Sequence, residues 1–446
     1  MTRIRFVRGQ VLHAPVRGRI DIYTDAFLAI DGATGRITTF HPETQPEDVE
    51  RLRHAMQVDA SAVLELSPTQ FLMPGFIDTH VHAPQYQFTG TGTDTPLMEW
   101  LNKYTFPVEA SFADVNVATA WYTKLLDRML SEGITTAQYF ATIHVEATQR
   151  LVELVEERGQ RAFVGLISMD RNAPQSYVSP TTQQCLADAE AFVKWTLSRN
   201  NELVQPVVTP RFVPTCTPEL LQGLGELAAR FNVRIQSHIA ESHDEETFVE
   251  MLHPGQRDTE IFKAANLLSS RSCMAHAVHL KDDELDVFST TNTSIAHCPL
   301  SNFFFANGLL DIHRCWGKNV HVGLGTDIAG GYSPSMLRAI QTAVLTSKAL
   351  EIATPRGDFM AIDFKDAFWV ATMGGAFALG IDRDTGSFEV GKCLDGIIVD
   401  TSRGHTIDVA DRDTPMDVFQ KIIHNGDNRN FVRVIVKGKT VHQADS

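Results

Sequence analysis

The chain has 446 residues, of which 43% are hydrophobic, which is enough for one large domain with its own core and a smaller second domain. Fifty-four acidic residues against 39 basic ones give a formal net charge of -15, so we expect no nucleic-acid partner. No apolar stretch reaches the roughly 18 residues of a membrane helix, and the first residues lack the apolar segment of a secretory signal. The six cysteines are scattered without a C-x-x-C pair, which predicts free thiols in the cytoplasm.

Both ends of the chain contain short apolar runs that are typical of β-strands. These runs are residues 26–30, 63–66, 395–400 and 432–441. Chain termini are often close together in space, so we expect antiparallel strands from 1–71 and 386–446 to form one small β-sandwich. Residues 72–385 would then form the main domain between them.

The main domain shows eight short apolar or β-branched runs that alternate with helical patterns. The predicted strands are 75–82, 134–141, 161–168, 204–211, 233–239, 272–278, 293–298 and 320–326. Predicted helices include 113–130, 146–157, 218–230 and 336–350. This order predicts an α/β fold of parallel βα units, either an open doubly wound sheet or a closed (β/α)8 TIM barrel.

Four side chains that can bind a metal lie at the ends of predicted strands. His80 and His82 end the first strand, His238 ends the fifth, and Asp327 follows the eighth. A barrel brings all of its strand ends into one pocket, whereas an open sheet cannot easily do so, and this favours the barrel. The two histidines at i and i+2 project from the same face of their strand. An isolated H-x-H is often a surface or core pair, but the recurrence at other strand ends indicates a shared catalytic zinc with one position left for water.

Two further polar residues lie next to these ligands. Glu241 follows His238 by three residues and could carry protons to a substrate, or could simply open the next helix. His276 ends the sixth strand and could be a fifth ligand or could hydrogen-bond the reacting water. The fourth strand contains no lysine that could bridge two metals, so we favour one metal ion.

Three residues have side chains that suit a flat ring with an oxo group. Arg211 and Phe212 end the fourth strand, and Gln85 lies three residues after His82. A guanidinium donates to a carbonyl oxygen, an aromatic ring stacks, and an amide both donates and accepts. The alternative is that Arg211 pairs with a barrel carboxylate and Phe212 packs in the core.

Together these residues resemble the amidohydrolase superfamily over nearly the whole chain. The motifs that carry the resemblance are Pro74–His82, Gln236–Glu241, Met274–His276, Ala296–Asn302 and Gly325–Asp327. Within the superfamily the chain is most similar to the guanine deaminases, through His82–Tyr86, Glu99–Glu109 and Thr209–Phe212. The resemblance implies hydrolytic deamination of guanine to xanthine and ammonia, with one zinc ion per chain and a homodimeric assembly.

The resemblance also implies a role for each site residue. His80, His82, His238 and Asp327 would hold the zinc ion. Asp327 would also take a proton from the attacking water, Glu241 would protonate ring N3 and help to release the amine, and His276 would steady the hydroxide and the tetrahedral centre. Gln85, Arg211 and Phe212 would hold the purine, which also faces His238, Glu241 and Asp327.

Two other kinds of protein remain as alternatives. One is a related deaminase or chlorohydrolase that acts on another purine, a pyrimidine or an s-triazine. The other is a barrel without catalytic activity that serves as a scaffold, although such relatives usually lose metal ligands that this chain retains. The H-x-E patterns at His144 and His243 lack the P-C-x-x-C partner of the small zinc deaminases, which excludes that fold.

Overall fold

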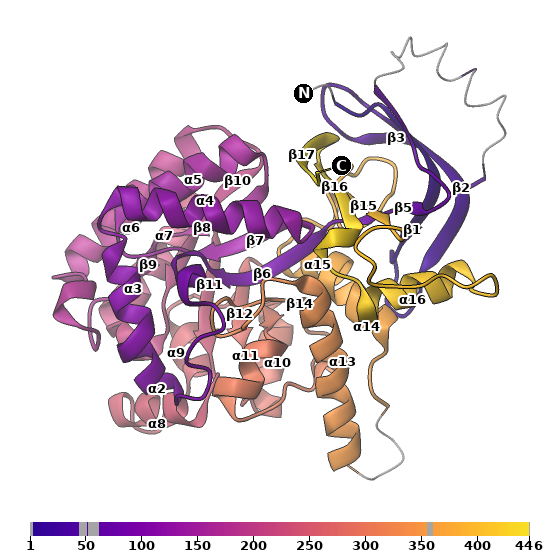
Figure 1. The fold of residues 1–446 in the computed structure, drawn as a ribbon. Coiled ribbons are helices and arrows are strands. Elements are labelled where there is room, and N and C mark those ends of the chain that lie inside the picture. Colours follow the sequence, from indigo (N-terminus) through magenta and orange to yellow (C-terminus); the bar gives the residue numbers. More distant parts are fainter. Residues whose placement is uncertain (1–2, 44–50, 52–61, 355–359, 446) are drawn as a thin grey trace.

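A computed structural model describes residues 3–43, 51, 62–354 and 360–445. Part of the predicted N-terminal range, residues 44–50 and 52–61, therefore lies outside the described residues. Figure 1 shows a barrel ringed by helices and, beside it, a sheet that contains the strands near both ends of the chain. The predicted fold class is confirmed.

The barrel is built from parallel strands in the order β14-β13-β12-β11-β10-β8-β7-β6. The strands are β6 (Phe76–His82), β7 (Ile134–Phe140), β8 (Arg161–Gly165), β9 (Ile167–Ser168), β10 (Val204–Pro210), β11 (Arg234–Ile239), β12 (Ser272–His276), β13 (Ser294–His297) and β14 (Val322–Leu324). Short β9 continues β8 and pairs with β10. The segment after β14 reaches β6 through the backbone N–H of Asp327, which donates to the carbonyl oxygen of His80 at 2.9 Å. Each of the eight predicted strands overlaps one of these barrel strands, with β9 lying inside the third.

Most of the larger helices lie between successive strands and cover the outside of the barrel, whereas α8 (His243–Leu252) lies at one end of it and α13 (Met336–Ala353) follows the last barrel strand (Figure 1). The other larger helices are α4 (Val115–Ser131), α5 (Val145–Arg158), α6 (Thr182–Ser198), α7 (Pro218–Phe231), α9 (Asp258–Ala264), α10 (Asp282–Thr291) and α12 (Ile312–Gly317). Asp114 and Thr217 show why α4 and α7 begin where they do, because each side chain accepts a hydrogen bond from a backbone N–H of the first turn. The four helices predicted from sequence agree with α4, α5, α7 and α13.

Shorter helical segments follow several strands. After β6 come η2 (Ala83–Phe88), α2 (Leu97–Trp100), η3 (Leu101–Thr105) and α3 (Phe106–Ser111). Elsewhere lie η4 (Gln175–Tyr177), η5 (Val213–Thr215), α11 (Pro299–Ser301), η6 (Asn302–Ala306), α14 (Phe364–Trp369), η7 (Val370–Gly374), α15 (Gly375–Ala378), α16 (Pro415–Asn425) and η8 (Asn428–Asn430). No helix within the described ranges is long and apolar enough to cross a membrane.

The second sheet has the order β17-β16-β15-β5-β1-β2-β3, with β4 paired to β1. Its strands are β1 (Phe6–His13), β2 (Asp21–Ile30), β3 (Ile37–His41), β4 (Val63–Glu65), β5 (Gln70–Pro74), β15 (Gly396–Asp400), β16 (Phe431–Val436) and β17 (Lys439–Gln443). Most pairs are antiparallel as predicted, but β1 is parallel to both β4 and β5. The chain passes through β2 and β3 before it returns beside β1, and this connection is long enough for parallel pairing.

The sheet has a hydrophobic core of its own and a buried ionic contact with the barrel. Val11, Leu28 and Ile435 are among the residues of that core, and none of them is exposed. Arg161 at the start of β8 donates to Asp395, which precedes β15, at 3.0 Å. The sheet thus contacts the end of the barrel where the strands begin.

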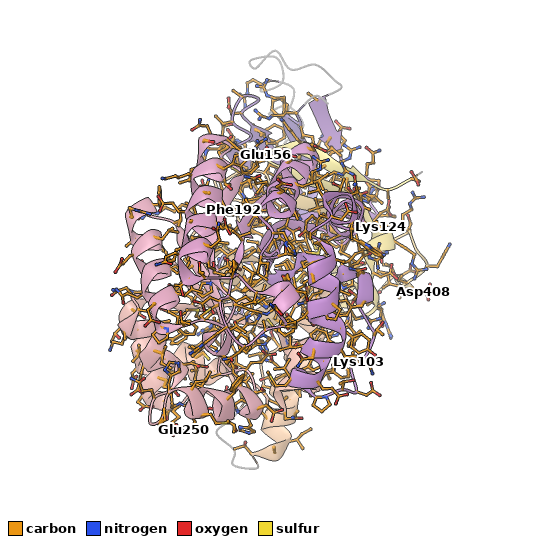
Figure 2. The ribbon with its side chains drawn as sticks, turned by 90° about the vertical axis from the view of Figure 1, so that its left-hand side faces the viewer. Lys103, Lys124, Glu156, Phe192, Glu250 and Asp408 are labelled. Carbon is orange, nitrogen blue, oxygen red and sulfur yellow. The ribbon has the colours of Figure 1, made fainter. Side chains whose placement is uncertain are left out.

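The opposite end of the barrel, where the strands finish, is covered by the connecting segments. Figure 2 shows Lys103 in η3 and Glu250 in α8 at one end of the barrel, and Glu156 near the end of α5 at the other. The segments after β6 and β11 therefore lie at the same end, where a TIM barrel places its active site.

Candidate metal centre and active site

The four predicted metal ligands lie together at the ends of three strands. His80 and His82 project from the end of β6, His238 from β11, and Asp327 from the turn after β14. All four side chains are buried, with no more than 8% of any residue exposed. The structure therefore brings together residues that are almost 250 positions apart in the sequence.

The ligand atoms lie close enough to share one metal ion, because His80, His82 and His238 lie within 4.8 Å of one another and Asp327 lies beside both His80 and His82. Asp327 Oδ1 lies 3.2 Å from His80 Nε2 and 3.6 Å from His82 Nε2, and the Nε2 atoms of His82 and His238 are 3.0 Å apart. Atoms bound at ~2.0–2.1 Å to a tetrahedral zinc ion are about 3.4 Å apart. His80 Nε2 is buried and has no hydrogen-bond partner, as expected of a nitrogen that is reserved for a metal. Three histidines and one carboxylate fit zinc.

A neighbouring group of possible ligands overlaps this site. His80, His276, Cys298 and Asp327 also have ligand atoms within 4.8 Å of one another. Cys298 is the less suitable ligand, because its thiol donates to the carbonyl oxygen of Ala296 at 3.5 Å. Burial raises the pKa of this thiol well above its ordinary value and so opposes formation of the thiolate that binds metals. All six cysteines are free, as the sequence predicts, and all six are buried.

Hydrogen bonds behind the ligands fix their orientation. His238 Nδ1 donates to the carbonyl oxygen of Arg211 at 2.6 Å, which leaves Nε2 directed at the metal position. Asp78 accepts from the backbone N–H groups of His80 and Thr326 at 3.2 and 3.0 Å and from the Thr326 hydroxyl at 2.5 Å. This one carboxylate ties β6 to the segment that carries Asp327. Asp78 was not among the predicted site residues.

Glu241 lies at the wall of the same pocket, in a turn held by two other carboxylates. Ala240 has a φ of +45°, in the left-handed region that residues with a side chain rarely adopt. The N–H of Ala240 donates to Asp258 at 3.0 Å, and the N–H of Glu241 donates to Glu245 at 2.7 Å. Helix α8 begins only at His243, so Glu241 is not the residue that opens it. The turn instead directs the Glu241 side chain into the pocket.

His276 lies between Glu241 and Asp327. Its Nε2 is 3.6 Å from Glu241 Oε1 and 3.7 Å from Asp327 Oδ2. Its Nδ1 donates to the side-chain oxygen of Asn302 at 3.0 Å, which leaves the Nε2 lone pair facing the pocket. Asn302 lies in one of the family motifs but was not predicted as a site residue.

Burial sets the protonation of these groups. It raises the pKa of Glu241 well above its ordinary range, and the charge of Asp327 raises it further. It also lowers the pKa of His276, which therefore favours the neutral form. A protonated carboxyl group and a neutral imidazole thus face the same space, and these are suitable forms for a proton donor and an acceptor.

Arg211 lies at the pocket and also pairs with a buried carboxylate, as the alternative interpretation of the sequence suggested. It lines the pocket, and it also forms a buried ion pair in which Nη1 donates to Glu109 at 2.5 Å. Gln85 lines the same pocket, with its amide nitrogen donating to Glu109 at 2.8 Å and its oxygen accepting from the N–H of Ala329 at 3.1 Å. Phe212 is 5% exposed and also contributes to the wall. Glu109 ends the Glu99–Glu109 motif but is not among the predicted site residues.

The pocket beside the metal position is partly aromatic. Besides the residues already described, its lining includes Leu97, Trp100, Leu101, Ser301, Phe305 and Gly330. The rings of Trp100 and Phe305 are 4.9 Å apart and belong to segments that follow different strands. All predicted site residues except His80 therefore line one pocket, and His80 lies next to it, with Nε2 3.2 Å from Asp327 Oδ1.

Another group of possible metal ligands lies away from this pocket. His243, Glu246 and His279 form a partly exposed group, but Arg257 already binds Glu246 at 2.7 Å. The Nε2 of His279 bonds to the carbonyl oxygen of Ala306 at 2.9 Å. None of the three histidine and glutamate side chains lines the pocket.

A barrel with a sheet from both termini and a His-x-His centre at its strand ends defines a class of metal-dependent hydrolases. The sequence matches the model of the amidohydrolase family over residues 71–441. The chain therefore belongs to the amidohydrolase family.

The most similar relatives share a single activity, which is narrower than the family description. The chain is 42% identical to the guanine deaminase of Dictyostelium discoideum, with 98% of each chain covered. It is 38% identical to the guanine deaminase of Homo sapiens, with 97% of this chain and 96% of the relative covered. Among solved structures, the guanine deaminase from C. acetobutylicum with bound guanine has a TM-score of 0.90 at 28% identity, covering 98% of this chain and all of that one.

Proposed function

We propose that this enzyme hydrolyses guanine to xanthine and ammonia with the help of one zinc ion. The observation that carries the proposal is that a single pocket is lined by three of the metal-ligand residues, by Glu241 and by the Arg211 and Gln85 donors. The similarity to guanine deaminases over nearly the whole chain supports the same substrate. Guanine carries a leaving amino group, which the metal centre and Glu241 could engage, and an oxo group, which Arg211 and Gln85 could engage.

The metal would be held by His80, His82, His238 and Asp327, whose donor atoms have suitable separations. A bound zinc ion lowers the pKa of water towards about 7 and so supplies hydroxide at neutral pH. Asp327 has one oxygen towards the ligand histidines and the other towards His276, at 3.7 Å. It can therefore bind with one oxygen and accept a proton from water with the other.

The protein residues then move the protons of the reaction. The water oxygen bonds to C2 of guanine while one of its protons passes to Asp327, and neutral His276 accepts a hydrogen bond from the water through Nε2. Glu241 gives its proton to ring N3 and then carries the remaining proton of the C2 hydroxyl group to the amino group, and the proton held by Asp327 restores the carboxyl group of Glu241. The bond between C2 and the amino nitrogen breaks, ammonia leaves, and xanthine remains.

Arg211, Gln85 and the aromatic residues of the pocket would hold the ring. Arg211 and Gln85 have N–H groups left over from their contacts with Glu109, and these can donate to the oxo group. Phe212, Trp100 and Phe305 provide aromatic surface for a planar ring.

Several features of the whole molecule belong to the same proposal. We propose boundaries near residues 71 and 385 between the barrel and the terminal sheet, the first of which falls within β5, the strand of the sheet that leads into the barrel. We also propose a cytoplasmic homodimer with no nucleic-acid partner. The six free cysteines suit a reducing compartment, and the net charge of -15 disfavours phosphate backbones. Size-exclusion chromatography with light scattering tests the dimer.

Ammonia release from a panel of bases, with metal analysis of the same preparation, tests the function. The panel contains guanine, adenine, cytosine, adenosine and ammeline. We expect release from guanine with about one zinc ion per chain. A preparation that holds one metal ion but releases ammonia only from another ring would support the related deaminase or chlorohydrolase instead. A preparation without metal or activity would support the scaffold.

A further inference from the structure

Glu109, in α3, is a fully buried carboxylate behind the pocket wall and does not itself line the pocket. It accepts three hydrogen bonds, two from Arg211 at 2.5 and 3.2 Å and one from Gln85 at 2.8 Å. Both partners do line the pocket. Any influence of Glu109 on a ligand therefore passes through these two side chains.

The contact with Glu109 decides which way the Gln85 amide faces. Its nitrogen donates to Glu109, and its oxygen accepts from the backbone N–H of Ala329 at 3.1 Å. The reversed amide would place oxygen against carboxylate oxygen and N–H against N–H, so the observed orientation is the one that satisfies both ends. One N–H of Gln85 is left for a ligand.

The same carboxylate fixes the Arg211 guanidinium and balances its charge. Both terminal nitrogens of Arg211 bind Glu109, and the guanidinium lies 5.2 Å from the ring of Phe106. A planar guanidinium bound at two points cannot rotate freely, so its remaining donors keep a fixed direction. Since the pair is neutral overall, the site does not require an anionic ligand.

We propose that Glu109 is a positioning residue that determines specificity for a neutral ring with an oxo group. It aligns donors from two different barrel segments, the one after β6 and the one after β10, towards a single ligand oxygen. A ring without the oxo group leaves these donors unpaired, and an amino group in its place sets donor against donor. This inference rests on the proposed function, because it assumes that the oxo side of a purine faces Arg211 and Gln85.

The test compares two purines that lack the reactive amino group, so that binding is measured without turnover. Hypoxanthine carries the oxo group and purine does not. Calorimetry on the zinc-loaded enzyme should show tighter binding of hypoxanthine by the wild type. In Glu109→Gln, we expect the affinity for hypoxanthine to fall roughly 10- to 100-fold, because charge-assisted hydrogen bonds are misaligned. The affinity for purine should change less than about threefold, since purine offers no such acceptor.

Glu132→Gln is the matched control. Glu132 is also a buried glutamate, and it pairs with Arg128 at 2.9 Å. Neither Glu132 nor Arg128 lines the pocket. We expect the control to keep the preference for hypoxanthine. If Glu109→Gln does not fold, Glu109→Asp keeps the charge but is one methylene too short to hold both partners, and it should reduce the same preference.

Each outcome bears on one of the two proposals. Equal losses for both ligands in Glu109→Gln, or an unchanged preference in a folded Glu109→Gln or Glu109→Asp enzyme, would overturn the role of Glu109. A wild type that shows no preference for hypoxanthine would overturn it as well. Failure of the wild type to release ammonia from guanine, with the preference intact, would instead overturn the proposed reaction.

Discussion

Replacing Glu241 with glutamine should remove most turnover while leaving the fold and the metal centre intact. The backbone contacts that hold Glu241 come from Asp258 and Glu245 and do not use its own carboxyl group. Glutamine has nearly the same volume and fits the same 7% exposed position. The variant can still donate a hydrogen bond to a ring nitrogen, but it cannot release a proton to it.

The expected loss follows from the work that this side chain performs. A positioned acid or base typically accelerates a reaction by about 10²- to 10⁴-fold, so kcat should fall by that factor. This corresponds to about 3 to 5 kcal/mol in the activation free energy. KM should change by less than about fivefold, because the groups that hold the oxo side of the ring are unaffected.

The assay follows xanthine formation from guanine across pH, with zinc content and thermal unfolding measured on the same samples. Glu245→Gln is the control, since it makes the same change at a buried residue four positions later that does not line the pocket. Its amide oxygen can still accept from the N–H of Glu241, so kcat should fall less than about tenfold. A Glu241→Gln enzyme with zinc and at least a fifth of wild-type kcat would refute the proton-transfer role.

Three further predictions concern the metal, the pH dependence of stability and the terminal sheet. His82→Ala or His238→Ala should reduce bound zinc well below one per chain in metal analysis, since each removes one of four ligands; full zinc occupancy would exclude that residue as a ligand. Burial raises the pKa of Asp78 from 3.8 to about 7. Between these two values the folded state keeps a proton that the unfolded state loses. The unfolding free energy of the metal-free enzyme should therefore fall as the pH rises from about 4 to 7, by up to about 4 kcal/mol. Asp78→Asn should flatten that dependence in denaturant titrations, and an unchanged slope would contradict it. Phe27→Ala removes a buried ring that stacks on Phe6 at 5.1 Å, and it should lower the unfolding free energy by about 3 to 5 kcal/mol. The kcat at low temperature should be unchanged, because the terminal sheet lies away from the site. A loss of kcat in the folded enzyme would contradict this separation.

The metal ligands could be predicted because their signal is local. A histidine or aspartate directly after a buried strand has a known position once the strands form a barrel, whatever lies between them. His80, His82, His238 and Asp327 each meet this condition. The predicted strands overlap the observed ones for the same reason, since each is a short apolar run with its own boundaries.

The supporting residues could not be predicted, because their function depends on pairs of distant segments. Glu109 lies in a short helix, and its contacts with Gln85 and with Arg211, 102 positions later, show that it belongs to the site. Asn302 and Asp78 likewise act through His276 and Thr326. The parallel pairing of β1 with β4 and β5 has no local signal either, because pairing direction depends on how the chain returns.

Besides these supporting residues, the backbone conformation of the site could not be predicted from the sequence. Ala240, His276, Ala277 and Asp327 all have positive φ, between +45° and +73°, although none is glycine. Such conformations cost roughly 1 to 2 kcal/mol per residue, so a sequence-based reading assigns them to ordinary strand ends. They are held by specific contacts, including the N–H of Ala277 on the carbonyl oxygen of Ile239 at 3.0 Å.

These strained residues explain why the reactive groups converge. A strand that simply continued would send successive side chains to alternate faces, so that only every second residue could face the barrel axis. A left-handed residue at the end of β11, at the end of β12 and after β14 turns the chain at once. Glycine would make these turns more easily, but it has no side chain to offer, and at His276 and Asp327 the reactive side chain belongs to the strained residue itself. The strain therefore indicates that the positions of these groups, and not the stability of the turns, determine the sequence here.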